Sequence, residues 1–166
     1  MGKTALAVHW AHRIAPRFPD GQLHLNLRGF DPGGVAMAPA DAVRRALDAL
    51  GVPAERLPPT LDAQAAQYRS VVAGRRLLIV LDNARDPAHV RPLLPGTPGC
   101  LLLVTSRDQL AGLVAADGAH PLPLEPLAPE DARLLLTRRV GAARLAAERP
   151  RWPRCSTAAA GCRWPW

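Results

Sequence analysis

The sequence predicts an α/β fold built on a parallel sheet with helices on both of its faces, and three observations carry this prediction. Two continuous apolar runs, residues 77–81 and 101–104, each end in polar residues, which is typical of strands buried on both faces. Helical patterns precede, separate and follow these runs. Strands that alternate with helices along a chain indicate a parallel sheet in a three-layer arrangement.

The first elements are a helix and a strand. Residues 5–15 predict a helix that ends near Pro16, because proline cannot continue it. Residues 22–27 predict a strand, since leucines alternate there with polar residues. The glycines and prolines of residues 28–34 predict a loop.

Two helices are expected next. Residues 39–50 form an amphipathic pattern that ends at Gly51, and residues 61–73 form a second pattern that begins after Thr60. The apolar runs then predict strands over 77–82 and 101–105.

Shorter elements surround the second apolar run. Residues 87–94 and 108–116 predict short helices, and a short apolar segment follows at 122–124. Residues 129–140 predict a helix with proline and two acidic residues in its first turn, where acidic groups favour the helix dipole. We expect this helix to begin a further, helical subdomain.

Composition limits the classes of protein that the chain can represent. The 166 residues are 48% apolar, which suffices for a packed core. No apolar stretch is long enough to span a membrane and no secretory signal is present, so we expect a cytoplasmic protein. The three cysteines lack metal-ligand spacing. The net charge of +7 is scattered along the chain, which is a weak indication of nucleic-acid binding.

Gly2, Lys3 and Thr4 directly precede the first predicted helix and match the closing half of a phosphate-binding P-loop. In such a loop, backbone N–H groups hold phosphate oxygens, the lysine neutralises the β and γ phosphates, and the threonine hydroxyl ligates Mg²⁺. Lys3 is the only lysine beside 20 arginines, which favours a specific function for it. A chance occurrence of this short motif at a basic N-terminus is the alternative.

Asp82 ends an apolar strand, as a Walker B carboxylate does, at the carboxyl edge where open α/β sheets bind ligands. Arg107 follows the next strand, where its guanidinium could contact a γ phosphate; a surface arginine that ends a strand is the alternative. Asn83 follows Asp82, and an amide cannot accept a proton from an attacking water. We therefore expect at most slow ATP hydrolysis.

Four segments resemble the NB-ARC domain of STAND-class P-loop ATPases, in the version found in SARP-type regulators, the actinobacterial antibiotic regulatory proteins. The segments are Leu25 to Pro32, Leu78 to Ala84, Val104 to Arg107, and Leu124 to Leu127 with Glu130, Asp131, Ala132 and Leu135. The resemblance as a whole covers about residues 2–149.

The resemblance implies an ADP/ATP switch in a transcriptional regulator. Residues 1–127 would form a partial nucleotide-binding core and 128–149 the start of the helical subdomain. Gly2, Lys3, Thr4 and Arg107 would bind nucleotide, while Thr4 and Asp82 would bind Mg²⁺. DNA would be contacted only by other domains, and the full-length protein could oligomerise.

Both ends of the chain depart from the family. The glycine-rich stretch before Gly2 and the strand before it are missing, which suggests a misplaced start in a longer gene. We therefore expect a gap or an exposed edge at the centre of the sheet. Residues 150–166 replace a Gly-Leu-Pro-Leu motif that can be recovered in another reading frame, so we interpret them as a frameshifted tail.

These departures lead us to expect that the 166-residue chain is poorly stable and binds nucleotide weakly. Two alternatives to the switch stay open. One is a P-loop kinase or NTP hydrolase that acts on a small substrate, and the other is a non-functional remnant of a regulator gene.

Overall fold

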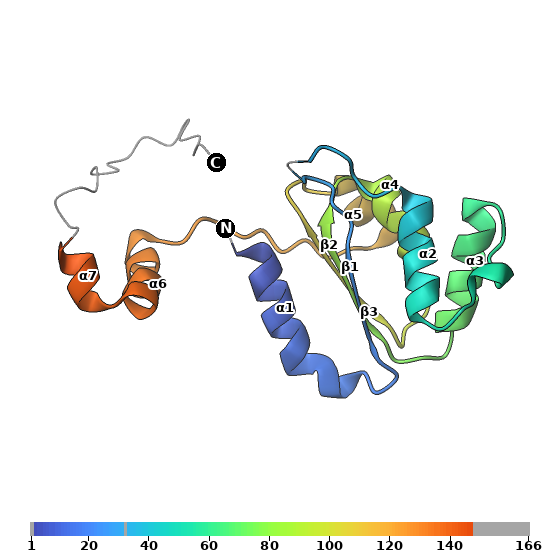
Figure 1. Ribbon diagram of the computed structural model, residues 1–166, viewed down its shortest axis with the longest axis horizontal. Coiled ribbons are helices and arrows are strands. Elements are labelled where there is room, and N and C mark those ends of the chain that lie inside the picture. The colour runs from blue at the N-terminus through green and yellow to red at the C-terminus, as the bar shows by residue number, and fades with distance from the viewer. Residues whose placement is uncertain (1, 32, 148–166) are drawn as a thin grey trace. The chain divides into compact units, whose positions relative to one another are not determined.

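The computed structural model describes residues 2–31 and 33–147 (Figure 1). These residues form two compact units, one spanning Gly2–Leu124 and one that begins at Glu125. The first unit contains α1 (Lys3–Ile14), β1 (Gln22–Asn26), α2 (Pro39–Ala49), α3 (Leu61–Val72), β2 (Leu78–Ala84), α4 (Pro87–Val90), β3 (Leu101–Ser106) and α5 (Ala111–Asp117). The second unit contains α6 (Pro129–Val140) and α7 (Ala142–Ala147). The predicted frameshifted tail at 150–166 lies outside the described residues.

The three strands form one parallel sheet in the order β1-β2-β3, which confirms the predicted α/β class. β2 pairs with β1 from Gln22↔Leu78 to Asn26↔Asp82. It pairs with β3 from Leu78↔Leu101 onward. The expectation of a gap at the centre of the sheet is wrong, because β2 is the central strand and forms backbone hydrogen bonds with both of its neighbours. The apolar runs of β2 and β3 can pair in register without another strand between them.

Successive side chains of β2 pack alternately into two apolar clusters, which lie on opposite faces of the sheet. Leu78 and Val80 pack with Ala11 of α1, on the face that α1 covers (Figure 1). Ile79 and Leu81 belong to the larger cluster with residues of α2 and α3, on the opposite face. The first unit therefore has the predicted three layers, with the sheet between α1 and the pair α2 and α3.

Local signals explain where the helices begin and end. α2 starts with Pro39, whose missing N–H costs nothing at that position, and Gly51 follows with φ 84°. The Thr60 side chain caps α3 by accepting a hydrogen bond from the N–H of Ala63 at 3.4 Å. The predicted bounds of both helices differ from the observed ones by a single residue.

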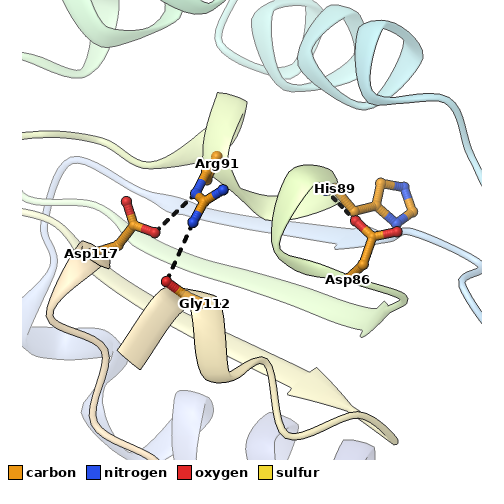
Figure 2. Close-up of polar contacts among 5 residues, drawn as sticks. All are labelled: Asp86, His89, Arg91, Gly112 and Asp117. Carbon is orange, nitrogen blue, oxygen red and sulfur yellow. Dashed lines mark hydrogen bonds and ion pairs between the residues drawn. The ribbon is translucent and has the colours of Figure 1, made fainter. Parts of the chain in front are cut away.

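The predicted helix over 87–94 is divided into α4 and a 3₁₀ turn, Arg91–Leu93. Pro92 lacks the N–H that would continue an α-helix. The side chain of Asp86 caps α4 by accepting a hydrogen bond of 2.9 Å from the N–H of His89 (Figure 2). Arg91 then joins this segment to α5, through an ion pair of 3.1 Å with Asp117 and a hydrogen bond of 3.3 Å to the Gly112 carbonyl (Figure 2).

The second unit begins its helical part where the sequence predicts it. α6 starts at Pro129 with Glu130 and Asp131 in its first turn, and Gly141 follows its last residue with φ 85°. Within residues 2–31 and 33–147, no helix has both the length and the apolar character needed to cross a membrane.

Candidate functional site

The start of α1 lies against the carboxyl end of β2, as the two halves of the predicted nucleotide site require. The Thr4 hydroxyl donates a hydrogen bond of 2.8 Å to Oδ1 of Asp82, across 78 positions of sequence. Gly2 is the residue before the helix, and Lys3 is its first residue. The tertiary structure thus places Gly2, Lys3 and Thr4 together with Asp82 at one edge of the sheet.

Asp82 sits in a β-bulge. Leu81 pairs with Val104 and Ala84 pairs with Ser106, so β2 has two residues, Asp82 and Asn83, opposite the single residue Thr105 of β3. A bulge of this kind bends a strand and re-aims its side chains. Asp82 keeps the alternation of β2, so its carboxylate lies on the same face as Leu78 and Val80, where Thr4 of α1 reaches it.

The Thr105 hydroxyl bonds to both residues of the bulge. It accepts a hydrogen bond of 3.0 Å from the N–H of Asn83 and donates a short one to Oδ1 of Asp82. Asp82 and Thr105 are both buried, with exposed fractions of 7% and 8%. A buried carboxylate needs hydrogen-bond donors, and the hydroxyls of Thr4 and Thr105 supply two on one oxygen.

Asn83 has a structural role that the sequence analysis did not assign. Its backbone is left-handed, with φ 60°, a conformation that asparagine tolerates better than most residues. Its carbonyl accepts a hydrogen bond of 2.7 Å from the N–H of Gly29, in the loop after β1. An asparagine at this position therefore has a structural explanation, because its backbone adopts the conformation that the bulge requires.

The distance between Thr4 and Asp82 fits a shared Mg²⁺ ion. Two neighbouring oxygens of an octahedral Mg²⁺, each about 2.1 Å from the metal, are about 3 Å apart. The observed separation of 2.8 Å between the hydroxyl and the carboxylate oxygen is close to this value. Hydroxyl and carboxylate oxygens are also the ligand types that Mg²⁺ prefers.

Arg107 directly follows β3, in a turn that two side chains fix. The Ser106 hydroxyl donates to the Ala84 carbonyl at 2.7 Å and accepts from the N–H of Asp108 at 2.9 Å. The Asp108 carboxylate accepts from the N–H of Leu110 at 2.7 Å. The guanidinium of Arg107 is exposed and lies 5.5 Å from the centre of the Phe30 ring, a cation–π distance.

A cavity of about 460 Å³ lies elsewhere, between the loop after β1 and the start of α2. It is lined by Arg28, Val35, Ala36, Met37, Ala38, Asp41, Arg44 and Arg45. None of the predicted site residues is among these described lining residues.

Sequence reasoning missed Thr105, Gly29 and Phe30 as parts of this edge. Thr105 gave one readable signal, since it is the first polar residue after an apolar strand, as Asp82 is. The part played by Gly29 and Phe30 depends on the path of a loop across the sheet, which periodicity does not reveal.

Two known proteins resemble the chain over most of its length. It is 52% identical over 149 residues to the regulatory protein AfsR of Streptomyces griseus and 50% identical over 149 residues to AfsR of Streptomyces coelicolor. Each match covers 90% of this chain, but only 15% and 14% of the two relatives. No protein-family model matches the chain. The chain thus spans about one seventh of the length of these curated relatives, and its identity to them shows that it is homologous to the AfsR regulatory proteins.

Proposed function

We propose that this chain is the ADP/ATP-binding switch segment of a transcriptional regulator, with an NB-ARC type of P-loop core. The hydrogen bond between Thr4 and Asp82 is the observation that carries the proposal. It joins the residue after the Gly-Lys pair to the carboxylate at the end of an apolar strand, which are the two Mg²⁺-binding parts of a P-loop site.

Each site residue has a distinct part in this proposal. Gly2 and the first turn of α1 would present backbone N–H groups to phosphate oxygens, and Lys3 would neutralise the β and γ phosphates. Thr4 and Asp82 would hold Mg²⁺, which offsets phosphate charge when it is bound. Arg107 would contact the γ phosphate and so distinguish ATP from ADP.

The regulatory part of the proposal rests on the two AfsR relatives, whose names describe regulatory proteins. Contact with DNA would belong to other parts of the complete protein, which would act in the cytoplasm and could oligomerise. Hydrolysis would be slow, because Asn83 occupies the position after Asp82 where a carboxylate could activate water.

Titration of ADP and ATP, with and without Mg²⁺, tests the proposal. The titration is carried out on the 166-residue chain and, where the gene encodes a longer protein, on that protein. Lys3→Ala should abolish most of the affinity, because the only lysine supplies a positive charge at the phosphates. Arg13→Ala is the matched control, since it removes a positive charge from the last turn of the same helix.

Two results would contradict the proposal. Equal affinity of the wild type and Lys3→Ala for both nucleotides would show that Lys3 does not bind the phosphates. Several turnovers per second with a small phosphate acceptor would favour the alternative, a P-loop kinase or hydrolase.

A further inference from the structure

The position of Arg107 depends on two restraints of different kinds. The backbone around it is fixed by Ser106 and Asp108, whose side chains close the turn after β3. The exposed guanidinium lies at the end of a long, flexible side chain, 5.5 Å from the centre of the Phe30 ring. An aromatic face attracts a guanidinium and limits the directions in which the side chain can point.

Phe30 and Arg107 belong to loops that follow different strands of the sheet. The loop of Phe30 follows β1, whereas Arg107 follows β3, and β2 lies between these two strands. The loop crosses the end of β2, where the N–H of Gly29 donates a hydrogen bond of 2.7 Å to the Asn83 carbonyl. The ring and the guanidinium thus come together from loops that follow the two outer strands of the sheet.

Only glycine fits at the crossing point. A Cβ atom on residue 29 would lie 2.5 Å from the Asn83 carbonyl oxygen and 2.6 Å from the Arg85 nitrogen, both of which are backbone atoms. The close approach of Gly29 to β2 thus lets the next residue, Phe30, extend to the far side of that strand.

From this arrangement we propose that Phe30 is a positioning residue for Arg107 and thereby increases the preference of the site for ATP over ADP. The inference rests on the proposed function, in which Arg107 contacts the γ phosphate. The ring holds the guanidinium at the carboxyl edge before nucleotide arrives, so less side-chain freedom is lost when the γ phosphate binds. ADP has no γ phosphate, and its affinity does not depend on this restraint.

Substitutions of Phe30 test the inference in two ways. Phe30→Leu keeps apolar bulk but removes the aromatic face, whereas Phe30→Tyr keeps the face and is the matched control. In the 166-residue chain without nucleotide, the NMR signal of the Arg107 Nε–H, assigned with Arg107→Lys, should show a ring-current shift. This shift should persist in Phe30→Tyr and disappear in Phe30→Leu, and a thermal unfolding curve of each variant verifies that it is folded.

The affinities for ATP and ADP are the second measurement. They are measured on the 166-residue chain or, where the gene encodes a longer protein, on that protein. Phe30→Leu should weaken ATP binding about two- to fivefold, the size expected for an exposed cation–π contact, and leave ADP binding unchanged. Phe30→Tyr should match the wild type. In an Arg107→Ala background, Phe30→Leu should have no further effect on ATP, because the group that it positions is gone.

Distinct outcomes would overturn the inference and the proposed function. Normal, Lys3-dependent ADP binding with an unchanged ATP-to-ADP ratio in Phe30→Leu would overturn the positioning role alone. An equal loss of ATP affinity in the Arg107→Ala background would do the same. If neither nucleotide binds in a Lys3-dependent way, the proposed function fails, and with it the role of Phe30 in nucleotide preference. The NMR shift would then report only the contact.

Discussion

Thr4 and Asp82 are 78 positions apart in sequence, and a hydrogen bond of 2.8 Å joins their side chains. One residue lies in the first turn of α1 and the other near the carboxyl end of the central strand of the sheet. A hydroxyl and a carboxylate oxygen at this separation can ligate one Mg²⁺ ion. This pair therefore defines the edge of the sheet at which the proposed nucleotide would bind.

Replacing the Thr4 hydroxyl should remove the Mg²⁺ dependence of nucleotide binding. Thr4→Val deletes the oxygen that donates to Asp82 and would ligate the metal, whereas Thr4→Ser keeps it. We expect Mg²⁺ to increase ATP affinity in the wild type and in Thr4→Ser, but not in Thr4→Val. Calorimetric titration with and without Mg²⁺ measures the difference, and an equal Mg²⁺ effect in all three proteins would contradict it.

Thr105→Val should destabilise the protein by about 1–3 kcal/mol, because it leaves the Asn83 N–H without its partner and removes one of the two hydroxyls that donate to Oδ1 of Asp82. Valine has nearly the shape of threonine, so the loss reports the hydroxyl. Thr105→Ser retains the hydroxyl and should lose less. Urea unfolding curves compare the two variants, and equal stabilities would show that the hydroxyl is not needed at the bulge.

Gly29→Ala should destabilise the protein by about 1–3 kcal/mol, as overpacking against fixed backbone atoms does. The added Cβ would meet the backbone of Asn83 and Arg85 at less than 3 Å. Gly33→Ala is the matched control in the same loop, where a Cβ meets nothing within 4 Å, and its effect should stay within about 0.5 kcal/mol. Thermal unfolding measures both. Similar losses in the two variants would contradict the close approach of Gly29 to β2.

Tyr68 is the only tyrosine, and its hydroxyl is fully buried with no hydrogen-bond partner among the described residues. Burial, with a smaller contribution from the nearby Cys100, raises the pKa of the Tyr68 hydroxyl. In the unfolded chain this group loses its proton near pH 10, while in the folded protein it keeps it. The unfolded state therefore binds fewer protons above pH 10, and stability falls as the pH rises.

The variant Tyr68→Phe isolates this effect. It should be at least as stable as the wild type at pH 7, because it removes a buried hydroxyl without a partner. Above pH 10 the wild type should lose up to about 1.4 kcal/mol per pH unit relative to the variant. Urea unfolding at pH 7, 10 and 11 measures the difference, and parallel pH dependences would rule out a titrating Tyr68.

Local patterns in the sequence determined the elements of the fold. The continuous apolar run of β2 predicts a strand buried on both faces, and alternating leucines predict the half-buried strand β1. Gly2, Lys3 and Thr4 before a helix predict the first half of the site. These features could be read because burial on one face or both imposes a period on neighbouring residues.

The tertiary structure decided which of these residues meet. The extra residue that places Asp82 and Asn83 opposite Thr105 depends on the register between β2 and β3, and many registers satisfy the same apolar pattern. The same register closes the sheet where a gap was expected. The contact between Phe30 and Arg107 involves a loop whose Gly29 packs against the backbone of β2 too closely for a Cβ atom. Contacts between residues far apart in sequence depend on how the elements pack, and the periodicity of the sequence does not encode that packing.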